Sequence, residues 1–434
     1  MKLMKTSLGL AAGAMIATGF ATVAKAELFV PVLSYRTGAF AGSGIPQANG
    51  FTDYLNMINE RDGGVGGVKL AIEECETGYN AQKGVECYEK TKAKGALIYN
   101  PYSTGITLQL IPKAAVDKIP VFSMGYGLSA AAVGEKFPWV FNAPATYWGQ
   151  ASAIVKYISE QEGGSLKGKK IGFIYLDVGY GREPIPVLEA LSKDMGFELV
   201  KLPVGVKEMQ NQSSQWLQVR RQRPDYMVMW GWGAMNPTAI KEAAKIRFPM
   251  EKFIGVWWSG SEGDVVPAGD GAKGYKAVSF HGAGTDFPVM QDIKKYVIDT
   301  GKSIGKGGNW GEVLYNRSVF NAMLVVEAIR NAQEITGKKE INGEDMRKGM
   351  EALDISSERL KELGFEGFAN PIKITCKDHS GAHEMFIQQW DGKSWNKVSD
   401  WMPPMKEKVR PLLEAAAEKY VSDKPNWPTQ TCAS

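Results

Sequence analysis

Two apolar stretches decide the fold of this chain: Met227-Val228-Met229-Trp230-Gly231-Trp232-Gly233 and Phe253-Ile254-Gly255-Val256-Trp257-Trp258-Ser259-Gly260. Each has the composition of a buried strand, ends in tryptophans and precedes a helical pattern, which is typical of parallel βαβ units. In such sheets ligands bind at the carboxyl ends of the strands. A tryptophan adds a large apolar surface and an N–H that needs a partner. We therefore predict an α/β fold with an aromatic-lined binding site at the strand ends.

The same alternation of strands and helices occurs twice, first over 28–123 and again over 170–280. It predicts two similar lobes, each a mostly parallel sheet flanked by helices. Helical patterns over 288–353 and a hairpin pattern over 372–390 follow, so we expect the chain to cross back and form a multi-strand hinge. The expected division is a signal peptide (1–26), a first lobe (27–145 with about 281–368), a second lobe (146–280 with about 369–400) and a C-terminal extension (401–434), the last interpreted as a surface appendage.

The first residues have the pattern of a cleavable export signal. Lys2 and Lys5 precede an apolar run over 8–23, and Ala24-Lys25-Ala26 has the A-x-A form of a cleavage site. The alternative, a membrane anchor, is disfavoured because the run is shorter than the roughly 20 residues that a span needs. We expect export to the periplasm.

Charge and cysteines narrow the class of protein. The formal charge of +4 falls to +1 without the three lysines of the signal, which leaves no basic footprint for nucleic acid. Four cysteines in an exported chain predict two disulfides. We expect Cys75–Cys87 and Cys376–Cys432, with free buried thiols as the alternative, although the sequence does not fix the pairing.

Several motifs resemble the periplasmic substrate-binding proteins of ABC importers, of the branched-chain amino-acid (leucine/isoleucine/valine) type. They include Asn59-Glu60 with Gly63-Gly64-Val65, the segment Asn100-Pro101-Tyr102-Ser103-Thr104-Gly105-Ile106-Thr107, Tyr180-Gly181, and the ending Ile387-Gln388-Gln389-Trp390-Asp391-Gly392. The resemblance covers about 27–400. It implies the type I periplasmic binding fold, a ligand clamped between two lobes, no catalysis, no cofactor and delivery to an inner-membrane ABC permease complex.

The resemblance also implies where the ligand lies. The loop carrying Tyr102, Ser103 and Thr104 would hold a ligand carboxylate, which agrees with the free N–H groups of a helix start; ordinary N-capping is the alternative. Gly125 and Tyr126 would give backbone and side-chain contacts. Tyr180 and Trp232 would close on the ligand from the second lobe.

Trp257 marks a departure from the family pattern. Amino-acid binders of this type usually have an acidic residue at its position, which pairs with the ligand ammonium group, and here Trp258 follows it. An indole offers only a cation–π contact, although Glu262 and Asp264 are candidate substitutes downstream. Arg36, after the first strand, is a further candidate for a carboxylate contact, and a surface ion pair is its alternative role.

Three other sequence motifs do not indicate functional sites. Gly269–Gly274 matches GxGxxG but precedes a strand, which is the reverse of a dinucleotide site. Gly301–Gly305 matches GxSxG but follows a helical pattern, so a nucleophile elbow is disfavoured. Cys376, His379 and His383 have a spacing that could suit zinc, but Cys376 is expected in a disulfide, so we expect no metal.

The sequence therefore favours a monomeric, non-enzymatic, periplasmic solute-binding protein of an ABC importer. Its expected ligand is a small carboxylate or amide, either a branched-chain or aromatic amino acid or an aromatic acid. The alternative is a periplasmic sensor that uses the same clamp to report its ligand to a membrane receptor, and sequence does not separate the two.

Overall fold

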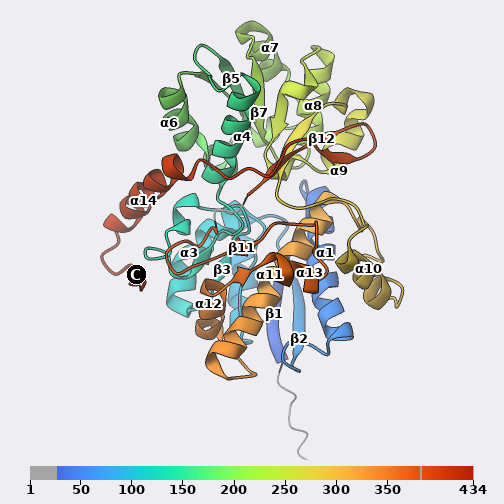
Figure 1. The fold of residues 1–434 in the computed structure, drawn as a ribbon, viewed down its shortest axis with the longest axis vertical. Helices are drawn as coiled ribbons and strands as arrows, with labels where there is room; N and C mark the ends of the chain where they lie inside the picture. Colours follow the sequence, from blue (N-terminus) through green and yellow to red (C-terminus); the bar gives the residue numbers. More distant parts are fainter. Residues whose placement is uncertain (1–26, 382–383, 434) are drawn as a thin grey trace, which may run out of the picture.

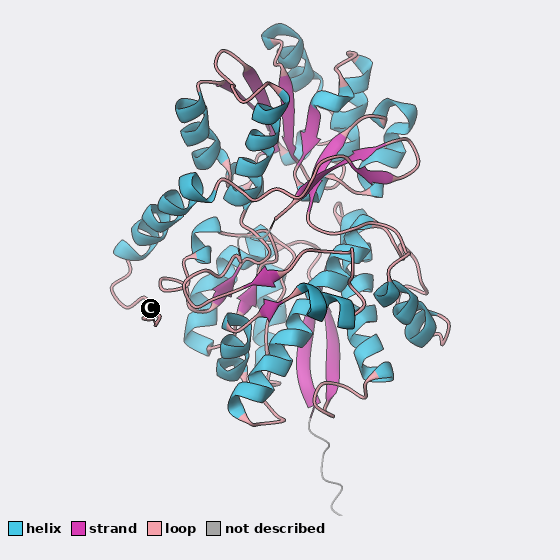
Figure 2. Ribbon diagram, viewed as in Figure 1, coloured by secondary structure: helices cyan, strands magenta, loops and turns pink. Residues whose placement is uncertain are grey.

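A computed structural model describes residues 27–381 and 384–433 of the chain, so the predicted signal peptide lies outside the described residues. The protein has two α/β lobes, one above the other in Figure 1. Figure 2 shows that helices cover both sheets. Among the described residues, no helix combines the length and apolar character needed to cross a membrane.

The first lobe is built on parallel strands. β1 pairs with β2 along eight residues, and single bridges at Asn100 and Tyr99 link β1 to β3, which pairs with β4. The predicted strand over 96–100 is thus reduced to two bridging residues. The elements of this part are β1 (Glu27–Ser34), α1 (Ala41–Arg61), β2 (Lys69–Glu76), α2 (Ala81–Lys92), α3 (Thr104–Asp117), β3 (Val121–Phe122), η1 (Ser129–Ala132) and β4 (Val140–Phe141).

The second lobe has a seven-stranded sheet in the order β13-β12-β9-β8-β7-β5-β6. Its first five strands in the chain are parallel, and the hairpin β12–β13 joins antiparallel at β9. The strands are β5 (Lys170–Leu176), β6 (Glu198–Val204), β7 (Tyr226–Trp230), β8 (Phe253–Gly255), β9 (Lys276–Ser279), β12 (Phe386–Trp390) and β13 (Trp395–Lys397). The helices are α4 (Tyr147–Gln161), α5 (Gly179–Arg182), α6 (Ile185–Met195), η2 (Val206–Glu208), α7 (Ser213–Gln222), α8 (Met235–Lys245), η3 (Met250–Lys252), η4 (Trp257–Ser259), α9 (Glu262–Val265) and η5 (Val266–Ala272).

After β9 the chain returns to the first lobe, as Figure 1 shows by colour. The returning elements are α10 (Pro288–Ile293), η6 (Lys294–Ile298), α11 (Val313–Thr336), α12 (Gly343–Glu351), β10 (Asp354–Ile355), α13 (Ser357–Glu362) and β11 (Ile372–Lys373). The chain crosses between lobes after β4, after β9 and after β11, which confirms the predicted multi-strand hinge. The exact residue boundaries of the two lobes stay a prediction.

Helix α11 is the main support of the first lobe, and it packs along α1. At Gly50 of α1 an added Cβ would lie 2.2 Å from the carbonyl oxygen of Tyr315, so only glycine permits this approach. Tyr315 is a core residue whose hydroxyl donates to Asp53 at 2.7 Å. This close packing fixes α11, and with it the buried side chains that its first turns present to the second lobe.

The C-terminal extension is a brace and not the predicted appendage. α14 (Lys406–Ser422) contacts α4 and η1, which belong to different lobes. The backbone N–H of Met405 donates to Ser152 in α4 at 3.0 Å, and the Trp427 indole donates to the Lys136 carbonyl at 2.6 Å. The sequence hid this role because the apolar stripe of α14 is narrow, with only Val409, Leu413 and Ala417 buried.

Both predicted disulfides are confirmed. Cys75–Cys87 joins the end of β2 to α2, with 5.8 Å between Cα atoms. Cys376–Cys432 has a Cα separation of 5.7 Å and ties the tail beyond α14 to the segment after β11. A bridge of this kind restricts the unfolded chain and so stabilises the fold, by about 2–4 kcal/mol in typical cases.

Candidate functional site

A cavity of about 230 Å³ lies between the two lobes, at the carboxyl ends of strands from both sheets. Its lining side chains are seven aromatic residues and one threonine: Tyr79, Tyr102, Thr104, Tyr126, Tyr147, Tyr180, Trp232 and Trp258. The lobes are close together here, since a Cβ on Gly233 of the second lobe would lie 2.8 Å from the Phe40 ring of the first. The cavity is therefore small and closed on both sides by protein.

The first-lobe wall is built around the start of α3. Ser103 caps the helix by accepting the Ile106 N–H at 3.4 Å, and Thr104 at the first helical position lines the cavity. Tyr102 has a φ of 49°, an unusual backbone state for a tyrosine, and its N–H donates to the Tyr126 hydroxyl at 2.6 Å. This bond joins two loops of the first lobe and sets the Tyr126 ring against the cavity.

The second-lobe wall of the cavity is formed by residues that follow β5, β7 and β8 in the chain. The Tyr180 hydroxyl donates to the Gly231 carbonyl at 2.9 Å, which fixes the tyrosine beside Trp232. Tyr147, at the start of α4, forms a hydrogen bond of 3.3 Å with Thr104 of the first lobe. Burial raises the pKa of Tyr180 and of Tyr147 well above its usual value, so both hydroxyls remain protonated at neutral pH.

The Gly125 carbonyl joins the lobes. It accepts the indole N–H of Trp257 at 3.1 Å, the indole N–H of Trp258 at 3.2 Å and the side-chain N–H of Gln150 at 3.2 Å. All three donors come from second-lobe elements, whereas Gly125 lies between β3 and β4. The Trp257–Trp258 segment is thus fastened to the first lobe by its side chains.

Trp257 does not line the cavity, contrary to the prediction that it faces the ligand in place of an acidic residue. Its ring is fully buried and lies against Gly125, where an added Cβ would come within 2.3 Å of it. Ser103 and Gly125 also act beside the cavity, as a helix cap and as a backbone acceptor, and neither lines it. The turn of η4 presents the neighbouring residue, Trp258, to the cavity instead.

Arg317, which the sequence reasoning missed, holds the same segment from the other side. It is fully buried in α11; its guanidinium donates to the Trp257 carbonyl and to His281 Nε2, the latter at 3.0 Å. The guanidinium carbon also lies 4.9 Å from the centre of the Trp258 ring, within cation–π range. Burial lowers the pKa of Arg317 to about 9, which leaves it cationic at neutral pH.

The two candidate acidic substitutes lie outside the cavity lining and are already engaged. Asp264 accepts bonds from Asn236 at 2.8 Å and from the Ser261 N–H at 2.8 Å. Glu262 accepts the N–H of Val313, the first residue of α11, at 3.0 Å and so forms another contact between lobes. Burial raises the pKa of Glu262 to about 7 and that of Asp264 to about 6.

Arg36 lies outside the cavity. Its guanidinium pairs with Glu74 of β2 at 2.5 Å and donates to Asn49 of α1 at 2.7 Å. This geometry is that of an ion pair, which was the alternative role considered for Arg36. The Arg36 side chain is 23% exposed. Its donors are turned toward its own lobe, because β1 and β2 are neighbours and bring Glu74 within reach.

Tyr79 and Tyr147 line the cavity but were not predicted. Tyr79 follows β2, so the rule of strand ends that selected the tryptophan segments could have found it. Tyr147 comes from the first crossing between the lobes, and no sequence signal marks it. Six predicted residues do meet in the cavity lining: Tyr102, Thr104, Tyr126, Tyr180, Trp232 and Trp258.

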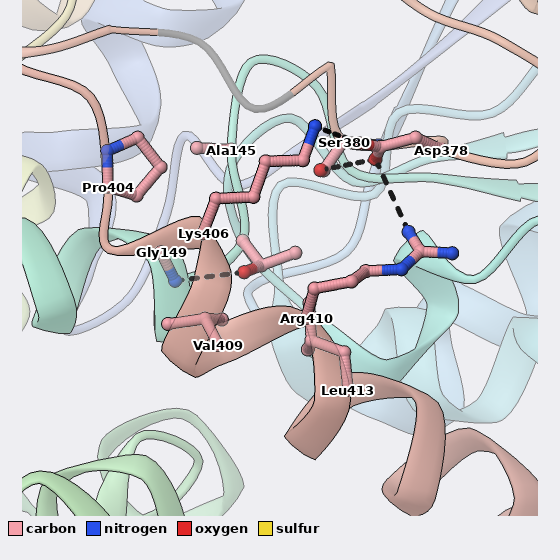
Figure 3. Close-up of a pocket in the computed structure, with 10 residues that line it drawn as sticks. Ala145, Gly149, Asp378, Ser380, Pro404, Lys406, Val409, Arg410 and Leu413 are labelled. Atoms are coloured by element: carbon pink, nitrogen blue, oxygen red, sulfur yellow. Dashed lines mark hydrogen bonds and ion pairs between the residues drawn. The ribbon is translucent and has the colours of Figure 1, made fainter.

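A second cavity, of about 350 Å³, lies between α14 and the start of α4. Figure 3 shows Lys406 and Arg410 of α14 pointing toward Asp378, with the nitrogen–oxygen distances at 3.7 and 4.0 Å. Asp378 also accepts the Ser380 hydroxyl at 2.6 Å. The charged side chains of this second cavity are paired with one another, so the cavity between the lobes is the stronger candidate site.

The considered zinc site does not form in the described part of the chain. Cys376 is in a disulfide, and the buried His379 ring bonds to the Val140 carbonyl at 2.8 Å through Nδ1. His383 lies outside the described residues. No group of three or more potential metal ligands occurs among the residues that the structure describes.

Comparisons with known proteins agree with this arrangement. A crystal structure from the Pseudomonas fluorescens group, titled as an ABC transporter permease, is 41% identical, with a TM-score of 0.87, over 94% of this chain and 99% of that one. A branched-chain amino-acid ABC transporter protein from Thermus thermophilus with bound valine is 21% identical, with a TM-score of 0.75, over 89% and 99% of the two chains. A solute-binding protein from R. palustris in complex with benzoate is 17% identical, with a TM-score of 0.67, over 87% and 97%.

No curated protein matches the sequence. The two more distant structures support the fold alone, at their level of identity. The family model described as "Periplasmic binding protein" matches residues 27–394, which is most of the chain. That family binds solutes and is not enzymatic. The chain therefore belongs to the periplasmic binding protein family.

Proposed function

We propose that this protein is the extracytoplasmic solute-binding component of an ABC importer. It holds a small ligand that bears a carboxylate or an amide between its two lobes and delivers the ligand to an inner-membrane permease complex. The candidates are a branched-chain or aromatic amino acid and an aromatic acid. The protein acts as a monomer in the periplasm, without a cofactor.

One observation carries the proposal: the cavity is lined from both lobes and lies beside the contacts that hold the lobes together. Tyr102 and Tyr126 come from the first lobe, and Tyr180, Trp232 and Trp258 from the second. A ligand in this position contacts both lobes at once. It therefore favours the closed state by its differential affinity, which is the physical requirement for a ligand-driven closure.

The size and surface of the cavity define the ligand further. The cavity between the closed lobes is small, so a ligand that fits it has few non-hydrogen atoms. Aromatic rings form most of the lining and favour an apolar or aromatic body. Hydroxyls and the N–H groups at the start of α3 serve a polar end.

The role in transport and the location rest on other support. Similar structures are titled as ABC transporter proteins. Export is supported by the pattern of residues 1–26 and by the two disulfides, which persist in oxidising compartments.

The binding test is a thermal unfolding series with the mature protein and a panel of amino acids, aromatic acids and amides. A ligand at 100 times its dissociation constant stabilises by about 2.7 kcal/mol. Small-angle scattering of the same samples reports closure. Deletion of the gene should abolish uptake of the binding solute by cells. A protein that shows neither stabilisation nor a copurified solute in native mass spectrometry would contradict the proposal.

A further inference from the structure

We infer that the ligand is a small carboxylic acid with an apolar body and without an ammonium group, so that the site selects acids over the corresponding amino acids and amides. The inference rests on the proposed function, because it names the substrate class of the same cavity. It is drawn from the balance between hydrogen-bond donors and acceptors around the cavity.

Several donors at the cavity have no acceptor. The Trp232 indole N–H is buried and unpaired among the described residues, and the Trp232 side chain, only 4% exposed, lines the cavity. Thr104 and Tyr147 hydrogen-bond to each other and so have one hydroxyl proton to spare.

The start of α3 adds backbone donors to the same region. The first N–H groups of a helix have no partner within the helix. The Ser103 side chain takes the N–H of Ile106, which leaves that of Thr104, a residue of the cavity lining, to a ligand. An unpaired buried donor costs about 1–3 kcal/mol, so a ligand that supplies acceptor oxygens removes several such costs at once.

The two backbone carbonyls beside the cavity are already in use. No carboxylate is among the lining side chains. The Gly125 carbonyl beside Tyr126 accepts three N–H groups, and the Gly231 carbonyl beside Trp232 accepts the hydroxyls of Tyr180 at 2.9 Å and Ser259 at 2.7 Å. An ammonium group has three donors and no acceptor. In this cavity it would be desolvated with only hydroxyl oxygens as acceptors and no carboxylate to neutralise it, which is unfavourable.

The same balance separates an acid from an amide. A carboxylate has acceptor sites only, whereas an amide adds two N–H donors that need acceptors. The unpaired N–H of Trp232 and the N–H of Thr104 at the start of α3 need acceptor oxygens, and a carboxylate supplies these without adding donors of its own. The polar end of the ligand is therefore a carboxylate.

A quaternary ammonium ligand needs no hydrogen-bond acceptor, and a set of aromatic rings is a known way to bind one. Here the cation–π interaction of Trp258 is already used by Arg317, whose guanidinium carbon lies 4.9 Å from the ring centre. Arg317 is buried and has no carboxylate within ion-pair distance among the described residues. Asp264 and Glu262 interact with this positive charge without forming an ion pair, and the part of it that they do not compensate opposes a second cation and favours an anion.

The test compares ligands that share a body and differ only in the polar end. One series is 4-methylpentanoate, leucine and 4-methylpentanamide; the other is 3-phenylpropanoate, phenylalanine and 3-phenylpropanamide; choline represents quaternary ammonium ions. Isothermal titration and thermal unfolding of the mature protein give the affinities. We expect at least one acid to bind 100-fold more tightly than its amino acid and its amide, and choline not to bind.

A matched pair of variants tests the assigned donor. Trp232→Phe keeps an aromatic ring but removes the N–H, and we expect the acid affinity to fall at least tenfold and the acid-to-amide ratio to shrink. Trp230→Phe is the control, because Trp230 also has a buried unpaired indole N–H but does not line the cavity. It should lower the melting temperature and leave acid affinity within twofold, whereas a purely structural role of Trp232 would leave the ratio unchanged.

The outcomes separate this inference from the function on which it rests. If leucine, phenylalanine, an amide or choline binds as tightly as the best acid, the inference is wrong and solute binding stands. The same holds if no acid binds but an amine copurifies with the protein. If no panel member binds and no copurified solute is found, both fail. An unchanged acid-to-amide ratio in Trp232→Phe would overturn the donor assignment.

Discussion

Two tryptophan pairs lie at the carboxyl ends of neighbouring strands and differ in the hydrogen bonds of their indole N–H groups. After β8, the indole N–H groups of Trp257 and Trp258 both donate to the Gly125 carbonyl of the opposite lobe. At the end of β7, the indole N–H groups of Trp230 and Trp232 have no acceptor among the described residues. One pair joins the lobes by hydrogen bonds, and the other has no partner in the described part of the protein. The difference shows that the same sequence pattern gives bonded or unbonded indoles according to what the opposite lobe presents.

The largest expected effect concerns the buried carboxyls of Glu262 and Glu183, which accept hydrogen bonds from the opposite lobe. Glu262 accepts the Val313 N–H, and Glu183 accepts the Ser129 N–H at 2.8 Å. Burial raises the pKa of each from 4.5 to about 7. Because the folded-state pKa is the higher one, the protonated form favours the folded state. The stabilisation is full below about pH 4.5 and is lost as pH rises through about 7.

Unfolding free energies at pH 5 and pH 8 measure this effect in the protein and in the Glu183→Gln/Glu262→Gln variant. At 1.36 kcal/mol per pKa unit, we expect the protein to lose about 2–3 kcal/mol per carboxyl relative to the variant over this range. Equal pH dependence of the two proteins would contradict the assignment.

Gly125→Ala should disrupt the hydrogen bond between the Trp257 indole and the carbonyl of residue 125. Gly125 has a φ of 67°, which disfavours alanine, and the new Cβ would lie 2.3 Å from the Trp257 ring. The matched control is Gly163→Ala, because Gly163 has a φ of 74° and open space around it. Backbone strain is common to both variants, so the difference reports the clash, which we expect to cost about 2 kcal/mol in urea unfolding. Variants of equal stability would show that the Trp257 ring moves freely.

Trp257→Phe, compared with Trp230→Phe, measures the contribution of the Trp257 indole hydrogen bond to stability. Trp257 and Trp230 are both fully buried, and only Trp257 has a hydrogen-bonded indole. Both substitutions lose similar packing, so Trp257→Phe should cost about 1 kcal/mol more than Trp230→Phe, the net value of one hydrogen bond. Chemical unfolding measures both. If the two variants lost the same free energy, the bond to Gly125 would contribute nothing to the closed form.

The fold follows from the sequence because its causes are local. Alternating apolar strands and helices predict both sheets, and the rule of strand ends selects Trp232 and Trp258, whereas Tyr102 and Tyr180 came from the family resemblance. The same rule covers Tyr79, which was overlooked. Both disulfides were also predictable, since four cysteines leave few pairings.

The contacts between lobes could not be predicted in the same way. Trp257 and Trp258 are adjacent, and which of them faces the cavity depends on Gly125 and Arg317, which are far away in the sequence. Local patterns carry no information on how the two walls meet. For the same reason the brace formed by α14 was not expected, because its two partners, α4 and η1, lie on different lobes.

The donors of Arg36, like that of Trp257, are already hydrogen-bonded within the protein. We therefore expect substitution of Arg36 to have the smallest effect. Its guanidinium is bound to Glu74 and Asn49, as the indole of Trp257 is bound to Gly125. Arg36→Gln should therefore leave the affinity for the best-binding acid of the panel within twofold and cost no more than about 1 kcal/mol of stability, as is usual for a partly exposed ion pair. Titration of that acid into the variant, beside Trp232→Phe, measures the contrast. A tenfold loss of affinity in Arg36→Gln would mean that the arginine leaves Glu74 to bind the ligand.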